Sequence, residues 1–312
     1  MNERSAKLKT ASWIGIIGNT FLAILKVIVG FVSGSFAVIG DGIDTLSDVL
    51  TYFITLFTAR IISKPADCKY PYGYKKAETI ATKILAFIIF FAGAQLLIST
   101  ITRLFNGELR DMPSIIAIYV TIFSIVGKFV LYYLQTRIGK RTNSAMILAN
   151  AKNMLNDVVI SSSVLIGLIF TFLLKMPVLD TITAMIVSFW IIWVAFGIYR
   201  DSSLELMDGV KDVSIYYKII KSVEQVEGAS NPHRIRVRKI ADLFLIALDI
   251  EVDENILVSK AHEIAKQVEQ ALKQNIGNIY DVLIHVEPLG NEEKEIFGIS
   301  RDSLTFTNTQ AG

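Results

Sequence analysis

The sequence predicts a membrane-embedded, all-α bundle of six helices followed by a C-terminal α+β domain. Apolar residues make up 52% of the chain, and the mean hydropathy of +0.49 exceeds that of ordinary soluble proteins. Six apolar stretches are each long enough to cross a hydrocarbon core of about 30 Å. From about residue 212 these long runs give way to short alternating ones. We therefore expect a transmembrane domain over residues 1–210, a second domain over 211–290 and a flexible tail over 291–312.

The expected membrane spans follow one another with short loops between them. They cover residues 11–32, 36–58, 79–101, 114–134, 145–173 and 178–198. The first lacks the cleavage site of a secretory signal, so we expect it to remain in the mature chain. Basic residues precede the first span and fill the loops after the second and fourth, whereas the alternate loops carry few. The positive-inside rule therefore predicts an integral protein of the cell (inner) membrane with both termini in the cytoplasm.

The second domain shows alternating helix and strand patterns. Residues 213–225 and 259–273 have the periodicity of amphipathic helices, and residues 233–240, 244–252 and 280–287 are typical of strands. The order helix, strand, strand, helix, strand (αββαβ) predicts a ferredoxin-like domain with both helices on one face of the sheet.

Charge and cysteine content exclude several classes of function. Residues 1–200 carry 19 Lys and Arg against 10 Asp and Glu, whereas residues 201–312 carry 12 against 19. Dispersed basic loops and an acidic domain exclude nucleic acid as a partner. Cys68 is the single cysteine, which excludes an intramolecular disulfide and a thiolate metal cluster.

Carboxylates lie inside two of the expected spans. Asp41, Asp44 and Asp48 share one face of the second span, and Asn153 and Asp157 share one face of the fifth. At about 1.5 Å per residue, Asp44 and Asp48 lie about 12 and 18 Å below one surface, and Asn153 and Asp157 lie about as deep below the other. Carboxylates this close in a low dielectric must share protons or bind a cation. The pattern predicts a divalent-cation site near the membrane midplane.

Other interpretations of these carboxylates remain open. An aspartate can pair with a lysine inside the membrane, and for Asp41 this pairing stands beside metal binding. Two membrane aspartates also suit an intramembrane aspartic protease, and an acidic ring suits a passive cation channel. A protease leaves the third aspartate and the soluble domain unexplained, and one asymmetric cluster fits a carrier better than a channel. The candidate lysines are Lys26, Lys83, Lys128 and Lys152.

Several motifs resemble those of the cation diffusion facilitator family, in order along residues 10–290. Residues 34–48 (GSFAVIGDGIDTLSD) resemble its second helix, residues 149–157 (ANAKNMLND) its fifth, and residues 65–78 (PADCKYPYGYKKAE) the loop after the second helix. Leu179-Asp180, Ala261-His262 and residues 285–288 also fit. The resemblance implies a homodimeric secondary transporter, not an enzyme, that exports divalent metal cations from the cytoplasm in exchange for protons.

The resemblance implies a transport site formed by Asp44, Asp48, Asn153 and Asp157. Zinc-transporting members commonly have His at one or both of the positions of Asp44 and Asn153, and this chain has no His in its expected spans. Oxygen ligands suit harder ions, so we expect Mn²⁺ rather than Zn²⁺, Co²⁺ or Fe²⁺ as substrate. A zinc-selective exporter of the same family is the alternative.

Two further features of the resemblance concern the loop residues. Asp67 matches a loop metal ligand of some relatives, but Tyr70 and Tyr74 replace the accompanying imidazoles, so we expect a weak loop site and tyrosines packed at the membrane interface. Lys76 and Asp208 occupy positions that pair in relatives near the dimer axis. Either residue could equally be a solvated charge.

The histidines all lie in the second domain. The resemblance implies a metal site there, at which a divalent ion would bring two such domains together. Neutral imidazoles with carboxylates form a reasonable ligand set for a transition metal. The implied ligands are His233, Asp249, His262, His285 and Glu287.

Overall fold

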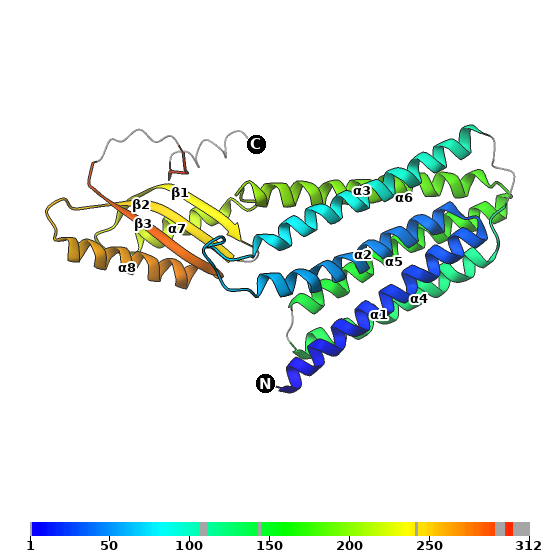
Figure 1. The fold of residues 1–312 in the computed structure, drawn as a ribbon, viewed down its shortest axis with the longest axis horizontal. Coiled ribbons are helices and arrows are strands. Elements are labelled where there is room, and N and C mark those ends of the chain that lie inside the picture. Colours follow the sequence, from blue (N-terminus) through cyan, green and yellow to red (C-terminus); the bar gives the residue numbers. More distant parts are fainter. Residues whose placement is uncertain (1, 107–111, 143–144, 241–242, 291–296, 302–312) are drawn as a thin grey trace. The chain divides into compact units, whose positions relative to one another are not determined.

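The computed structural model describes residues 2–106, 112–142, 145–240, 243–290 and 297–301. It has a helical unit, Met1–Ser63 with Ala81–Tyr199, and an α+β unit, Lys64–Ile80 with Arg200–Gly312. The predicted fold class, a helical bundle followed by an αββαβ domain, is confirmed (Figure 1). The elements are α1 (Asn2–Ser33), α2 (Phe36–Ile62), α3 (Lys76–Phe105), α4 (Ile116–Thr142), α5 (Ala145–Leu174), α6 (Val178–Leu206), α7 (Ser214–Glu224), β1 (Ser230–Ile240), β2 (Leu243–Val252), α8 (Val258–Asn275) and β3 (Ile279–Pro288).

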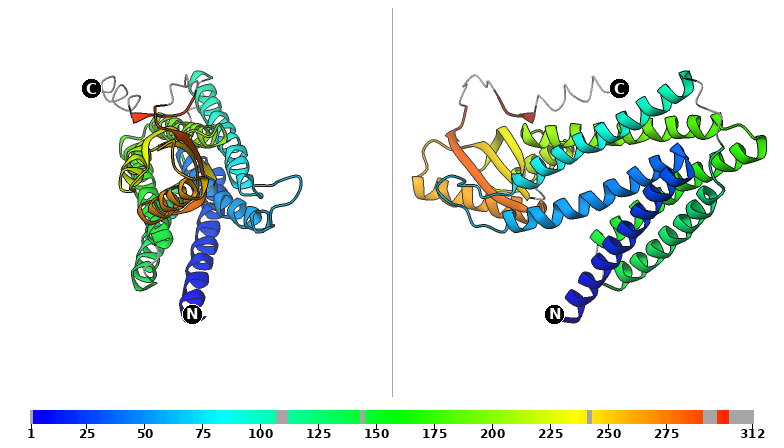
Figure 2. Two further views of the ribbon diagram at one scale, coloured as in Figure 1. Left: turned by 90° about the vertical axis from the view of Figure 1, so that its left-hand side faces the viewer. Right: turned by 45° about the vertical axis from the view of Figure 1, so that its right-hand side comes forward.

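Four helices of the helical unit pack in a closed ring. Helix α1 contacts α2 and α4, and α5 contacts α4 and α2; α1 and α4 lie side by side in every view (Figures 1 and 2). Buried apolar side chains, among them Val38, Leu96 and Val187, join α2 to α3 and α6. By length and composition, α1, α3, α4, α5 and α6 could each cross a membrane. Helix α2 is not among these five, and it carries three aspartates, Asp41, Asp44 and Asp48.

Glycines bring the neighbours of α2 close to its backbone. A Cβ at Gly42 would lie 2.8 Å from Cγ2 of Val27 on α1, and one at Gly40 would lie 2.9 Å from Cγ1 of Val187 on α6. A side chain at either position would clash with its neighbour, so only glycine allows the helices to approach this closely, as in other closely packed membrane helices. The two glycines therefore fix α2 against helices on either side of the aspartates.

The start of α2 is capped from α6. Ser35 Oγ accepts a hydrogen bond from the Val38 amide at 3.2 Å and donates one to Asp180 Oδ1 at 2.6 Å. Asp180 Oδ2 accepts another from the Phe36 amide at 2.9 Å. A carboxylate at a helix N-terminus satisfies amides that have no partner within the helix and complements the helix dipole. Asp180 therefore holds α2 in place rather than contributing to the aspartate cluster.

The α+β unit has a three-stranded sheet in the order β1-β2-β3. Strand β1 pairs antiparallel with β2, and β2 pairs parallel with β3. Ile246, Leu248 and Ile250 of β2 belong to the same buried core as residues of α7 and α8, such as Ile219 and Val268. Because side chains alternate along a strand, Ala247, Asp249 and Glu251 lie on the opposite face of the sheet.

Part of the expected C-terminal tail pairs with the sheet. Ile299 and Ile235 form an isolated antiparallel bridge, with both N···O distances 3.0 Å. The Phe297 ring faces the guanidinium groups of Arg234 and Arg236 at 5.2 and 5.3 Å from the ring centre. An edge strand such as β1 offers unpaired backbone groups, which gives this segment a place to bind. The rest of the tail, 291–296 and 302–312, lies outside the described residues.

Candidate functional site

Helices α2 and α5 contact one another and bring two of the predicted site residues together. Asp48 on α2 and Asp157 on α5 both approach the ammonium group of Lys128 on α4. Lys128 Nζ lies 2.5 Å from Asp157 Oδ2 and 3.4 Å from Asp48 Oδ2. Asp48 and Asp157 thus meet at one point, and that point already holds a positive charge.

Burial differs between the lysine and its two partners. The Lys128 side chain is fully buried, whereas the side chains of Asp157 and Asp48 are 11% and 36% exposed. The ammonium therefore reaches the carboxylates from the protein interior, on the α4 side. Asp48 and Asp157 are therefore both paired with an intramembrane lysine. The sequence had suggested such a pairing chiefly for Asp41.

Asp41 lies in a separate buried network. Its Oδ2 is 2.8 Å from Lys26 Nζ on α1, and its Oδ1 accepts a hydrogen bond of 2.8 Å from Ser161 Oγ on α5. Lys26 Nζ also donates to Ser161 Oγ at 2.9 Å and to Thr45 Oγ1 at 3.1 Å. The ion pair is 0% and 1% exposed. This network ties α1, α2 and α5 together and matches the interpretation of Asp41 as one half of an ion pair.

Asp44 and Asn153, the other two predicted ligands, form no ion pair with Lys128 among the described residues. Asp44 is half-buried and within electrostatic range of Asp157, Asp41, Lys26 and Lys128. Asn153 is exposed, one turn before Asp157 on α5. Among the described residues, therefore, Asp48 and Asp157 meet at the Lys128 ammonium group, and Asn153 is the exposed member of the predicted set.

Exposure of the candidate ligands rises in one direction along both helices. On α2, Asp41 is buried whereas Asp44 and Asp48 are both half-buried, and on α5 exposure increases from buried Asp157 to exposed Asn153. These directions run toward the C-terminal end of α2 and the N-terminal end of α5. Both ends adjoin the loops whose basic residues predict a cytoplasmic location.

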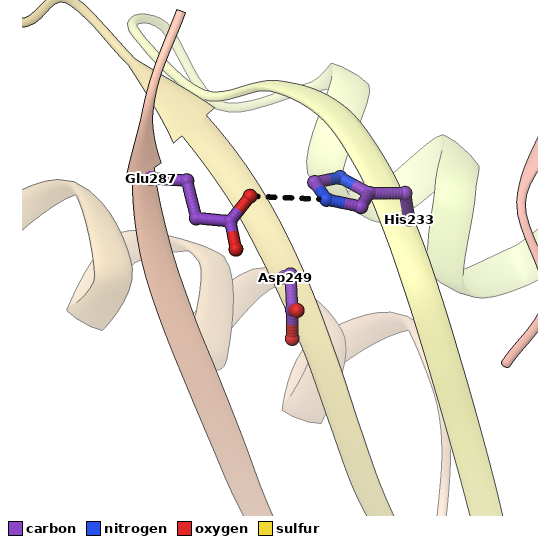
Figure 3. Close-up of side chains that lie close together, drawn as sticks. All are labelled: His233, Asp249 and Glu287. Atoms are coloured by element: carbon purple, nitrogen blue, oxygen red, sulfur yellow. Dashed lines mark ion pairs between the residues drawn. The ribbon is translucent and has the colours of Figure 1, made fainter. Parts of the chain in front are cut away.

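A second cluster lies on the sheet face opposite α7 and α8. His233 on β1, Asp249 on β2 and Glu287 on β3 each offer a ligand atom, and these atoms lie within 4.8 Å of one another (Figure 3). His233 Nε2 is 3.2 Å from Glu287 Oε2, and its Nδ1 is 2.7 Å from the Asn231 carbonyl. All three residues are buried. One imidazole and two carboxylates suit a divalent transition metal.

Backbone irregularities in β1 aim His233 at this cluster. The pairing of β1 with β2 shifts on both sides of His233, and Asn231 and Arg234 have positive φ angles of 42° and 46°. Simple alternation would place His233 on the same face as Ile235 and Val237, which pack against the helices. A β-bulge changes the direction of a side chain in this way.

Two arginines share the acidic groups of the cluster. Arg234 Nη1 lies 3.0 Å from Asp249 Oδ2 and 3.8 Å from Glu287 Oε1, and Arg236 Nη2 lies 3.7 Å from Asp249 Oδ1. A metal ion at Asp249 would compete with these guanidinium groups.

The other predicted ligands of this domain take different positions. His285 is 65% exposed, and its Nε2 lies 3.4 Å from Glu287 Oε1 at the rim of the cluster. His262 is exposed on α8 and is not part of the group within 4.8 Å. The five residues that the resemblance implied therefore form a buried set of three, one rim histidine and one separate histidine.

Asp67 is occupied by its own loop. Its Oδ1 accepts hydrogen bonds of 2.8 Å from the amides of Lys69 and Tyr70, and its Oδ2 accepts one of 2.5 Å from the Tyr74 hydroxyl. The Tyr74 hydrogen bond is the largest cause of the lowered pKa of Asp67, and the same bond raises the pKa of Tyr74 to about 12. The Tyr74 phenol thus donates a hydrogen bond to Asp67. Both carboxylate oxygens of Asp67, which a metal would need as ligands, are already engaged in hydrogen bonds within the loop.

Lys76 and Asp208 form an ion pair in the α+β unit. Lys76 Nζ lies 2.8 Å from Asp208 Oδ1, and Arg238 Nε lies 3.4 Å from Asp208 Oδ2. Both side chains of the Lys76–Asp208 pair are about a third exposed, at 39% and 32%. Exposed pairs of this kind contribute little to stability, about 0–1 kcal/mol.

Known proteins resemble this chain along most of its length. Residues 12–207 match the family model of the cation efflux transmembrane domain, and residues 212–289 match that of the cation efflux protein cytoplasmic domain. The manganese efflux system protein MneS of Bacillus subtilis is 29% identical over 92% of this chain and 99% of that protein. The manganese efflux system protein MneP of the same organism is 28% identical over 93% and 99%. A metal-bound C-terminal domain of the CzcD transporter from Thermotoga maritima is 38% identical over 26% of this chain and 94% of that domain, with a TM-score of 0.25.

Proposed function

The chain belongs to the cation efflux family, and on that premise we propose that it exports Mn²⁺ from the cytoplasm in exchange for protons. Membership makes it an integral membrane metal transporter with a cytoplasmic domain, not an enzyme. The intramembrane protease is therefore set aside.

The observation that carries the proposal is a membrane site with oxygen ligands alone. Asp44, Asp48, Asn153 and Asp157 are its proposed ligands, and the three histidines of the chain all lie beyond residue 232. Carboxylate and amide oxygens suit Mn²⁺ better than the softer ions that imidazole favours. Two relatives, the manganese efflux system proteins MneS and MneP, support the same choice.

Loading from the cytoplasm is supported by the exposure of the ligands. Asp44 and Asp48 are half-buried and Asn153 is exposed, whereas Asp41, which lies nearer the N-terminal end of α2, is buried. We infer a cytoplasm-facing arrangement, with both termini in the cytoplasm and the protein in the cell membrane. Alternating access would then move helices around a site near the midplane.

Proton coupling follows from competition for the same oxygens. Metal binding requires ionised carboxylates, so loading releases protons and unloading takes them up. Because the membrane unit has no histidine, Asp44, Asp48 and Asp157 would themselves carry the protons.

The second domain is proposed to respond to metal and to hold the dimer. His233, Asp249 and Glu287 would bind a divalent ion, with His285 at the rim able to turn inward. The match to the cytoplasmic domain of cation efflux proteins supports a homodimer. The Lys76–Asp208 pair would then support the chain near the dimer axis.

The test is transport in proteoliposomes whose outer face corresponds to the cytoplasm. We expect Mn²⁺ uptake to require an acidic lumen and to collapse when an ionophore removes the pH gradient. Uptake indifferent to the gradient would indicate a channel. Parallel assays with Zn²⁺, Co²⁺ and Fe²⁺ test the metal, and faster transport of Zn²⁺ than of Mn²⁺ would favour the zinc-selective alternative.

A further inference from the structure

We propose that Lys128 is a tethered cation that competes with the metal for Asp48 and Asp157, and that metal binding moves its ammonium group to Ser124. This inference rests on the proposed transport site and adds a residue that sets how tightly that site holds its ion.

The first step is the position of the ammonium. Lys128 Nζ contacts one carboxylate oxygen from each of two helices, Asp157 Oδ2 at 2.5 Å and Asp48 Oδ2 at 3.4 Å. A divalent ion held by the same two aspartates must also lie between α2 and α5. Two positive groups cannot share that space in a low dielectric without strong repulsion. The ammonium therefore has to withdraw when the metal arrives.

The second step is the place to which it can withdraw. Ser124 lies one turn before Lys128 on the same face of α4, and long helical side chains point toward the N-terminal turn. Ser124 is 0% exposed, and its Oγ is buried without a hydrogen-bond partner among the described residues. A buried hydroxyl without a partner is costly. Accepting the displaced ammonium would satisfy it.

The third step is a comparison with the other buried lysine. Lys26 is held by Asp41, Thr45 and Ser161, all within 3.1 Å. Lys128 instead holds one buried carboxylate, Asp157, at 2.5 Å and one partly exposed carboxylate, Asp48, at 3.4 Å. Lys26 is therefore held by three buried groups, whereas Lys128 contacts one partly exposed carboxylate and has a candidate second partner, Ser124, one turn away.

Competition of this kind weakens metal binding by a predictable factor. A ligand that binds only the fraction of molecules in a competent state shows an affinity reduced by that fraction, so an ammonium withdrawn in about one molecule in ten costs about tenfold in apparent Kd. The same reduction helps a carrier to release its ion.

The experiment measures Mn²⁺ binding to the purified full-length protein, at roughly pH 8, where protons compete least. A His233→Ala background removes the imidazole from the buried cytoplasmic cluster and so weakens this competing site. We expect Lys128→Met to lower the Kd about tenfold, and Lys128→Arg, which keeps the charge, to restore weak binding. Lys83→Met is the matched control, because Lys83 lies in a span and faces the Tyr199 ring at 4.8 Å; it should leave the Kd unchanged.

Ser124→Ala gives an independent test of opposite sign. Loss of the hydroxyl should raise the Kd several-fold in the wild type and have no further effect in Lys128→Met. Unchanged or weaker binding in Lys128→Met, or an unchanged Kd in Ser124→Ala, overturns the proposal. If Lys128→Met does not fold, Ser124→Ala and a structure of the wild type saturated with Mn²⁺ decide, since Lys128 Nζ should then lie beyond about 4 Å from both carboxylates.

An Asp157→Asn variant separates this inference from the proposed function. Mn²⁺ binding that survives Asp157→Asn means that the transport site itself is wrongly assigned. Binding that Asp157→Asn abolishes but Lys128→Met does not tighten means that only the competition by Lys128 is wrong.

Discussion

The Lys26–Asp41 ion pair offers the sharpest test of how the helical unit is held together. Both side chains are buried, the charged atoms are 2.8 Å apart, and Ser161 bridges the pair. Removing one partner of such a pair leaves an unpaired buried charge, which costs about 3–5 kcal/mol. Lys26→Met and Asp41→Asn should each show this loss, because each leaves the other residue without its counter-charge.

The combined variant should recover most of that loss. Met has nearly the volume of Lys, and Asn keeps an oxygen for the Ser161 hydroxyl, so Lys26→Met/Asp41→Asn removes both charges with little change in packing. Neutral replacements of a buried pair are often tolerated without loss of stability. The double variant should therefore be more stable than either single variant.

Thermal unfolding of the detergent-solubilised protein measures the effect. At roughly 2–4 °C per kcal/mol for a unit of this size, each single variant should lower Tm by roughly 10 °C. Lys83→Met, which removes a membrane lysine without breaking an ion pair among the described residues, should change Tm little. Single losses that simply add in the double variant would refute the reasoning, because coupled neighbours must deviate from additivity.

Two further outcomes follow from the site geometry. Asn153→His should raise Zn²⁺ transport relative to Mn²⁺ in proteoliposomes, since it adds a softer ligand at the exposed end of the site; an unchanged ratio would place selectivity elsewhere. Tyr74→Phe should raise the pKa of Asp67 toward its ordinary value, because the lost hydrogen bond is the main cause of its lowering. Carboxyl ¹³C NMR measures the pKa of Asp67 in the wild type and in Tyr74→Phe. In the wild type the Tyr74–Asp67 hydrogen bond is fully present above the ordinary Asp pKa and is lost as pH falls through the lowered pKa. Identical Asp67 titration curves in the two proteins would count against this hydrogen bond.

Local patterns predicted the architecture because they carry the relevant information. Apolar length indicated the spans, period-2 alternation indicated the strand over residues 233–240, and helical spacing placed Asp44 and Asp48 on one face. Each of these signals depends on neighbours in sequence.

Partners across helices and strands could not be found in this way. Four lysines were candidates to pair with an aspartate, and only helix packing shows that Lys26 meets Asp41 and Lys128 meets Asp157. The spacing of four residues between Ser124 and Lys128 places two polar side chains on one face of an apolar helix, and this was a usable signal in the sequence that Lys128 faces the bundle interior. The position of His233 depends on a bulge at Arg234. Arginine is not a residue that favours a positive φ angle, so the sequence gives no sign of this bulge.

The most direct test of the central claim is Mn²⁺ flux through the wild type and through Asp48→Asn and Asp157→Asn in pH-gradient proteoliposomes. The matched control is Lys26→Met/Asp41→Asn, which removes the third aspartate of the α2 stripe but none of the proposed ligands. We expect both ligand variants to lose transport while remaining folded dimers, and the control to transport Mn²⁺ at close to the wild-type rate. Wild-type flux in Asp48→Asn or Asp157→Asn would contradict the assignment of the transport site.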